Sequence, residues 1–221
     1  MKGVQARRAH RGLGILAALV LATSASAAAA PYGPASRGLD ATRVLVARLA
    51  ARGRGEAAVT LTRTDPLGGP PQVEQGRLAL EPPARARLDF PASGERVAVR
   101  AGGGEWIQPA AHQLVRLTRA RSETAAGLWQ VLLRGGEERF RERSSGARRR
   151  VLEAKPEGGE GLPDRITVDL DPQGLPAALE LDDGSGSTVR YQFRGWRFSG
   201  PQGDRAFTLV PPRGYAVIDM P

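Results

Sequence analysis

The sequence predicts an α+β fold in a single domain: a strongly curved antiparallel sheet, an unclosed β-barrel, with a helical lid over an apolar cavity. Three observations predict it. From residue 57 onward, apolar residues recur at every second position in short runs, which is the period of half-buried strands. The connections between these runs are short, which favours antiparallel meanders over parallel crossovers. A sheet of about ten such strands must curl or close, and two helices can cover its apolar face only in part.

An export signal is predicted at the N-terminus. Four basic residues precede the apolar run 13–22, and the small residues 25–27 offer a cleavage site. The run is too short for a permanent membrane anchor, and no second apolar run follows. The pair Arg7-Arg8 lacks the apolar residues that follow a twin-arginine motif, so the general secretory route is favoured. The predicted boundaries are 1–30 for the signal peptide, 31–36 for a flexible leader and 37–221 for the folded domain.

Charge and cysteine content narrow the classes of function. Removing residues 1–30 removes four basic and no acidic residues, so the formal net charge of +9 falls to about +5. The remaining surface is only mildly basic, and no nucleic-acid partner is expected. The chain has no cysteine, which excludes disulfides, thiolate metal ligands and N-terminal lipidation. Burial alone must therefore hold the fold together.

Two segments have helical periodicity. The first is "LDATRVLVARLAAR", whose leucines share one side and which is expected to end at Gly53. The second is "SETAAGLWQVLLRGG", with Ser122 as the candidate N-cap and with Leu128 and Leu132 on a common face. These two helices are the predicted lid.

The predicted strands lie between and after the two helices. In chain order they are "AAVTLTRT", "GRLAL", "ARARLDF", "RVAVRA", "EWIQ", "QLVRLT", "ERFRER", "RRRVLEA", "RITVDLD", "AALELDD", "STVRYQFRGWRF", "AFTLVPP" and "YAVID". Turn residues separate them, mostly glycine, proline, aspartate and serine.

Alternation assigns a face to each side chain of the stretch 75–91. One parity is apolar and is expected to face the cavity: Leu78, Leu80, Ala84, Ala86, Leu88 and Phe90. The opposite parity is expected to face water or the outer surface: Arg77, Arg85 and Arg87. A bulge at Pro82-Pro83 would shift this register, because neither proline can donate a hydrogen bond to the ladder.

Candidate catalytic groups are few. Outside the signal, His112 is the only histidine, and it lies in a strand-like run with no nucleophile motif nearby. The carboxylate pairs Glu137-Glu138 and Asp182-Asp183 adjoin glycine-rich turns, where acidic residues are common. The run "AGGGEW" lacks the lysine and hydroxyl residue of a phosphate loop and is interpreted as a hairpin turn. We therefore expect a protein that is not an enzyme, with no metal and no cofactor.

The densest basic run is "RFRERSSGARRR", from Arg139 to Arg150. Its alternation around "SSGA" predicts a hairpin with an arginine-rich face. We interpret this face as a solvated surface that protects a sheet edge. The alternative is docking to an acidic partner or to anionic lipid head groups.

Several segments, in their order along the chain, carry a resemblance to a known family. They are "ATRVLVARL", "GRLAL", "PARARLDFP", "GGEWIQPAAHQLVRL", "LEAKP", "LELDDGSGSTVRYQF" and "FTLVPPRGYAVID". Together they resemble the LolA family, periplasmic carriers that receive lipoproteins at the inner membrane and hand them to an outer-membrane receptor.

The resemblance implies an unclosed barrel with a helical lid over an apolar cavity, and a periplasmic location. It implies acylated lipoproteins or a related lipid as cargo, with an inner-membrane lipoprotein-releasing ABC transporter and an outer-membrane receptor as partners. It also implies transient contact with the membrane surface and a monomeric state. The receptor shares the fold but is a lipoprotein, so the lack of cysteine favours the carrier. The residues expected to line the cavity are Leu78, Leu80, Ala86, Leu88, Phe90, Trp106, Leu128 and Leu132.

The chain departs from the family at the lid latch. In the family, an arginine directly before the proline of the "PARARLDFP" segment latches the lid to the barrel; here that position, aligned on Pro83, is Pro82. Two aromatic positions of the family are Ala86 and Leu88, and the tyrosine of the Gly-x-x-Trp-x-Tyr turn is Gln108. The chain therefore lacks the arginine of the family's latch, and the cavity is expected to be more aliphatic.

The alternative function is a periplasmic sensor of the RseB type, a regulator that binds a lipid or a partner protein in the same fold. Those regulators carry an additional C-terminal domain, whereas this sequence ends at Pro221, directly after the expected last strand. The carrier is therefore the preferred hypothesis.

Overall fold

The computed structural model describes residues 40–118, 127–136, 139–144, 146–156 and 162–220. The strands are β1 (Arg54–Thr64), β2 (Gln72–Glu81), β3 (Arg85–Asp89), β4 (Arg96–Arg100), β5 (Gly103–Gln108), β6 (Gln113–Leu117), β7 (Phe140–Ser144), β8 (Arg149–Ala154), β9 (Arg165–Leu170), β10 (Pro176–Asp182), β11 (Thr188–Ser199) and β12 (Ala216–Met220). The helical elements are α1 (Asp40–Ala51), α3 (Gly127–Arg134) and two 3-10 turns, η2 (Pro109–Ala111) and η3 (Asp204–Phe207).

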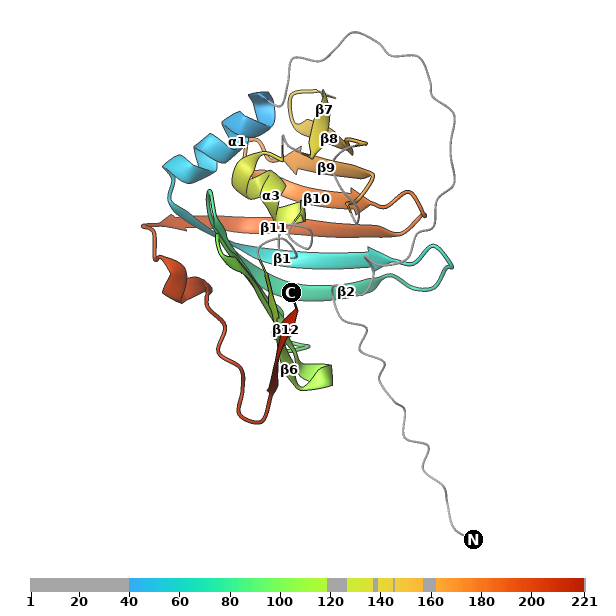
Figure 1. Ribbon diagram of the computed structural model, residues 1–221. Helices are drawn as coiled ribbons and strands as arrows, with labels where there is room; N and C mark the ends of the chain where they lie inside the picture. The colour runs from blue at the N-terminus through green and yellow to red at the C-terminus, as the bar shows by residue number, and fades with distance from the viewer. Residues whose placement is uncertain (1–39, 119–126, 137–138, 145, 157–161, 221) are drawn as a thin grey trace.

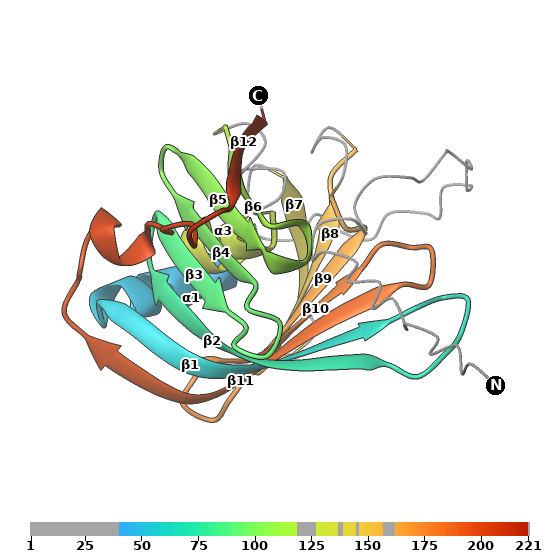
Figure 2. The same ribbon diagram turned by 90° about the horizontal axis from the view of Figure 1, so that it is seen from below.

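One strongly curved sheet contains all twelve of these strands (Figure 1). The strand order is β12-β6-β5-β4-β3-β2-β1-β11-β10-β9-β8-β7. The sheet does not close, because β12 and β7 stand at opposite ends of this order. Seen from below, the short strands β3 to β6 bend away from the long strands β1, β2 and β11 (Figure 2). The predicted fold class, a curved and unclosed antiparallel sheet, is confirmed.

The prediction of antiparallel pairing throughout is wrong at one edge, where β12 lies parallel to β6. The segment "AFTLVPP" is also not a strand: residues 204–207 form η3, and no strand follows until β12. Phe207 and Leu209 are buried against the sheet instead. Pro211 and Pro212 have no N–H to donate to a ladder, so this segment crosses the outer face as irregular chain. Because β12 is reached by this long crossing and not by a hairpin, its direction can be parallel.

Helix α1 ends where the sequence predicts. Leu45 and Leu49 point into the core, and both are almost completely buried. Gly53 follows the helix in the left-handed conformation, with φ of 82°. A methyl group there would come within 2.6 Å of the Ser199 carbonyl oxygen at the end of β11. Glycine therefore allows the chain to leave α1 and enter β1 beside β11.

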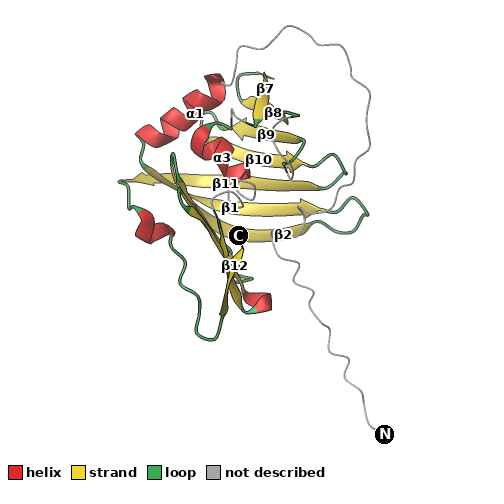
Figure 3. Ribbon diagram, viewed as in Figure 1, coloured by secondary structure: helices red, strands yellow, loops and turns green. Residues whose placement is uncertain are grey.

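Helix α3 is the described part of the second predicted helix, and the candidate N-cap Ser122 lies outside the described residues. Val131, Leu132 and Leu133 of α3 are buried in the same core cluster as Leu45 and Leu49 of α1. The two helices lie together on one face of the sheet (Figure 3). This face is the inner one, and its apolar side chains form the main core.

A second, smaller core lies on the outer face of β4 to β6. It consists of Ala98, Ile107, Leu114 and Leu209, with Tyr215 packed against it. The first three come from the sheet, and the last two come from the crossing segment that leads to β12. The crossing segment therefore covers apolar side chains of the outer face that would otherwise meet water.

Candidate ligand-binding site

The predicted register of β2 and β3 is confirmed. Arg77 pairs with Asp89 and Leu78 with Leu88, without a bulge, and Pro82 and Pro83 lie in the turn between the two strands. The apolar parity of the two strands faces the main core, whereas Ala84, predicted on the same face, lies in the turn and is only partly buried. The opposite parity faces the outer surface, as predicted.

Most residues predicted to line a cavity are packed in the core. Six of them belong to the main cluster and are 3% exposed or less: Leu78, Leu80, Ala86, Leu88, Phe90 and Leu132. Trp106 is 6% exposed and pairs with Val97 and Val115 on the same face. The side chain of Leu128 lies outside the described residues. A role of these residues in lining a ligand cavity stays a prediction.

The indole N–H of Trp106 is a buried donor on the inner face. Within the described part of the chain it has no hydrogen-bond partner. A buried N–H without a partner costs free energy, which an acceptor on a ligand would recover. The ester or amide carbonyl of an acylated molecule is an acceptor of this kind.

Position 82, where the resemblance places a latch arginine, is a proline in this chain. Pro82 is partly buried and carries no charge. An arginine of the helix contacts the β2–β3 turn instead. Arg134, at the end of α3, donates from Nε to the Pro83 carbonyl oxygen over 3.3 Å. Helix α3 is thus joined to the β2–β3 turn through an arginine of the helix itself.

Arg85 and Arg87 hold the crossing segment on the outer face. Arg85 forms ion pairs with Glu81 at 2.6 Å and with Asp204 at 2.5 Å, and the hydrogen bond to Asp204 raises the pKa of its guanidinium. Arg87 donates to the Ala206 carbonyl oxygen over 3.2 Å. The sequence predicts the face of these arginines but not the partners Asp204 and Ala206, each of which lies 119 residues away in the chain.

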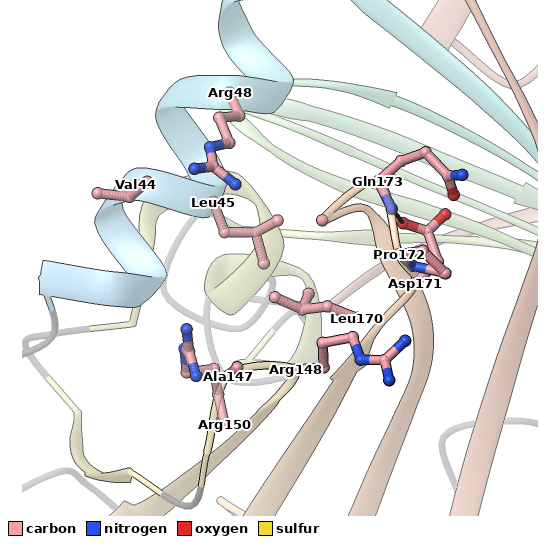
Figure 4. A pocket seen from close by; sticks show the side chains of 11 residues that line it. Val44, Leu45, Arg48, Ala147, Arg148, Arg150, Leu170, Asp171, Pro172 and Gln173 are labelled. Atoms are coloured by element: carbon pink, nitrogen blue, oxygen red, sulfur yellow. Dashed lines mark hydrogen bonds between the residues drawn. The ribbon is translucent and has the colours of Figure 1, made fainter.

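A cavity of ≈ 570 Å³ lies at the edge of the inner face, between α1, the β7–β8 turn and the β9–β10 turn (Figure 4). Its size is within the range of small-molecule sites, about 300–1,000 Å³. Val44, Leu45 and Leu170 give it an apolar floor. Leu45 belongs to the main core and Leu170 packs against it, so the floor continues into the core.

Three arginines surround this floor: Arg48 from α1, with Arg148 and Arg150 from the β7–β8 turn and the start of β8. Asp171 is the acidic residue of the lining. Its Oδ1 accepts hydrogen bonds from the backbone N–H groups of Gln173 at 2.9 Å and Leu175 at 2.8 Å. This carboxylate is therefore part of the β9–β10 turn. None of the predicted cavity residues lines this site.

Helix α1 is tied to the sheet next to this cavity through a buried carboxylate. Glu142 of β7 is 5% exposed, and it accepts a hydrogen bond from the Thr42 hydroxyl over 3.3 Å. It also lies 3.4 Å from Nε of Arg150. Thr42 itself is fully buried. The Thr42–Glu142–Arg150 contact therefore fixes the edge of the helical lid over β7 and β8.

The arginine-rich hairpin is largely neutralised by neighbouring carboxylates. Arg141 and Arg143 both pair with Glu153, at 3.3 and 2.9 Å. Arg149 pairs with Asp169 at 2.7 Å, and this contact lowers the pKa of the Asp169 carboxyl. These pairs favour the interpretation of the hairpin as a charged sheet surface over a docking face for acidic partners.

The other candidate groups have structural surroundings. His112 is exposed, has a left-handed backbone with φ of 50°, and lies edge-on to Tyr215 at 5.6 Å between ring centres. Asp182 and Asp183 accept backbone N–H groups in the β10–β11 turn. Glu137-Glu138 lies outside the described residues. In the described ranges, no group of three or more metal-ligating side chains is present, and no helix there is long and apolar enough to cross a membrane.

Comparisons with known proteins identify the fold. No protein-family model matches the sequence, and a search of curated proteins finds no match. An uncharacterized conserved protein from Thermus thermophilus has a similar structure, with a TM-score of 0.52, 11% identity, and 82% of this chain and 100% of that chain covered. A putative outer membrane lipoprotein-sorting protein domain from Vibrio parahaemolyticus has a TM-score of 0.50 and 12% identity, with 77% and 96% covered.

A LolA superfamily protein from Nitrosomonas europaea also matches, with a TM-score of 0.43 and 9% identity over 79% of this chain and 99% of that chain. At these identities, similarity concerns the fold. The chain has a LolA-like fold, as its sequence resemblance predicts.

Proposed function

We propose that this protein is a periplasmic carrier that shields the acyl chains of lipoproteins, or of a related lipid, and delivers them from the inner to the outer membrane. One observation carries the proposal. The apolar inner face of the unclosed sheet is continuous with the floor of a cavity at its edge, through Leu45 and Leu170. The LolA-like fold and the predicted export signal support it.

The physical task of such a carrier is to keep acyl chains out of water. Each exposed CH₂ group costs about 0.8 kcal/mol, so a chain of ordinary length cannot leave a membrane unaided. An apolar interior reached under a movable helix offsets this cost. The helices α1 and α3 are short. Besides the side chains that they bury in the main core, the polar contacts Thr42–Glu142 and Arg134–Pro83 hold them to the sheet. Delivery needs a better-fitting acceptor, and no bond has to be made or broken.

A titration with a fluorescent, uncharged acyl ester tests this function directly. We expect saturable binding, and we expect Leu170→Asn to weaken it about fivefold, the effect of about 1 kcal/mol of lost apolar contact at the cavity floor. Val210→Asn is the matched control, because Val210 is 77% exposed and lies away from the cavity. Absence of binding by the unmodified protein would exclude the carrier function.

A second candidate function is a regulator of the RseB type that binds a partner protein. The observation that favours it is the outer edge of the sheet. Val217, Ile218 and Met220 of β12 are 40–42% exposed, and β12 is an edge strand to which another chain can add. Affinity purification from the source cells separates the two functions: a membrane-bound regulatory partner without lipoproteins supports the regulator, and lipoproteins or lipid support the carrier.

A further inference from the structure

Two arginines of the edge cavity have no acidic partner among the described residues. Arg48 comes from α1 and Arg148 from the β7–β8 turn, and both are exposed. In Figure 4 they lie on different sides of the cavity, with Leu45 and Leu170 between them. For neither does any carboxylate of the described chain lie within ion-pair distance. The guanidinium of Arg48 reaches toward the β9–β10 turn, where a methyl group on Gly174 would come within 2.9 Å of its Nη1.

Two carboxylates lie at or beside the cavity, and neither pairs with Arg48 or Arg148. Asp171 lines the cavity, and its Oδ1 accepts two backbone N–H groups of its own turn. Glu142 is held by Thr42 and Arg150. Among the described residues, the cavity therefore combines two arginines that form no ion pair, Arg48 and Arg148, with one that does, Arg150.

Most other arginines of the β7–β8 hairpin do have a carboxylate partner, so the unpaired Arg148 is an exception there. Arg141, Arg143, Arg149 and Arg150 each lie within 3.4 Å of a carboxylate oxygen. Arg148 belongs to the same run and lines the cavity, as Arg150 does, but it forms no ion pair with a described carboxylate. Guanidinium groups bind carboxylates and phosphates through paired N–H donors, so two of them beside one hollow favour an anion in it.

The floor of the same cavity is apolar. Val44 is 48% exposed, although Leu45 beside it is buried. Leu45 and Leu170 connect the floor with the main core. A small hydrophilic anion would leave this floor uncovered, whereas an amphiphile covers the floor with its chain and meets the arginines with its head group.

We propose that this cavity binds the anionic head group, a carboxylate or a phosphate, of an acyl-chain ligand, with Arg48 and Arg148 as the head-group ligands and Leu45 and Leu170 under the chain. The proposal rests on the proposed carrier function and adds the chemical class of the ligand. It makes the cavity selective for anionic amphiphiles over neutral ones of the same chain length.

The test compares pairs of probes that differ only in the head group. A fluorescent fatty acid is compared with its methyl ester, and a lysophosphatidic acid with the corresponding monoacylglycerol as unlabelled competitors. Inorganic phosphate is the head group alone. The variants are Arg48→Gln, Arg148→Gln and the double variant, with Arg194→Gln as the matched control, an exposed arginine of β11 outside the cavity.

We expect the acid to bind about tenfold more tightly than its ester, the effect of one charge-assisted hydrogen bond, and the double variant to abolish this preference while the ester binds as before. Arg194→Gln should retain the preference. Equal binding of acid and ester, unaffected by the variants, would overturn this inference and leave the carrier function standing. Failure of every acyl probe to bind would overturn both. Displacement of the acid by inorganic phosphate as effectively as by the lysolipid would overturn the role of the chain.

Discussion

Removal of Glu105 should detach the crossing segment from the outer face. The Glu105 side chain is 9% exposed, and it accepts hydrogen bonds from the backbone N–H of Leu209 at 2.7 Å and from Arg100 at 2.8 Å. In Glu105→Ala the buried Leu209 N–H loses its acceptor, which costs about 2 kcal/mol. Loss of the ion pair adds about 1 kcal/mol at most, since Arg100 is 28% exposed and can be hydrated. The free energy of unfolding should fall by about 3 kcal/mol.

Glu105→Gln separates these two contributions. The amide keeps a carbonyl oxygen for the Leu209 N–H, but its NH₂ group replaces the oxygen that accepts from Arg100. Only the ion pair with Arg100 is therefore lost, and we expect a loss of about 1 kcal/mol. Glu180→Ala is the control, because Glu180 and its partner Arg190 are 37% and 35% exposed. Its effect should stay below about 1 kcal/mol.

Urea unfolding followed by tryptophan fluorescence measures these differences, provided that the slope of the transition is unchanged between variants. Hydrogen exchange of the β12 amides supplies the local readout, since Glu105→Ala should accelerate it more than exchange in β9 or β10. Equal losses in Glu105→Ala and Glu105→Gln would refute the reasoning, because the Leu209 N–H would then carry none of the effect.

Three further predictions concern the core, the lid and pH. Leu88→Ala should lower the free energy of unfolding by about 3 kcal/mol, and Leu88→Met by less than about 1.5 kcal/mol. Arg87→Gln, at a side chain 25% exposed, should lower it by about 1 kcal/mol. A larger loss in Arg87→Gln than in Leu88→Ala, measured by urea unfolding, would contradict the assigned faces. Thr42→Val removes the hydroxyl that donates to buried Glu142, so it should destabilise the protein by about 1–2 kcal/mol and speed the uptake of an acyl probe in stopped-flow fluorescence. Thr42→Ser keeps the hydroxyl and should have neither effect. Unchanged uptake in Thr42→Val would show that α1 is not the moving part. Burial raises the pKa of Glu95 from 4.5 to about 7. The contribution of its protonated form to stability is therefore complete below about pH 4.5 and is lost as the pH rises through about 7. Glu95→Gln should remove this part of the pH dependence of the urea midpoint, and an unaltered pH profile would count against the burial of this carboxyl.

The sequence predicts the local features of the fold well. Alternation in the stretch 75–91 assigns the faces of Leu88 and Arg87 correctly, because the period of a strand is fixed by its backbone geometry. Gly53 marks the end of α1, because the chain needs a left-handed residue there. These signals act within a few residues and can be read without knowledge of the fold.

The cavity and the crossing segment could not be predicted in this way. Arg48 and Arg148 are 100 residues apart, and only the folded sheet brings both to one cavity. The contact of Arg87 with the Ala206 carbonyl is equally distant in the chain. The segment "AFTLVPP" has the composition of a strand, and only its two prolines indicate that it cannot join a ladder. Alternation gives the face of a residue, but not which distant segment covers that face.

The most direct test of the carrier function is the analysis of what the protein holds when it leaves the cell. The protein is purified from its source cells without detergent, and the material extracted from it is identified by mass spectrometry beside an equal amount of Leu170→Asn protein. We predict acylated lipoprotein or lipid in the unmodified protein and less of it in the variant. An unmodified protein that holds neither, and that takes up no acyl ester afterwards, would contradict the account.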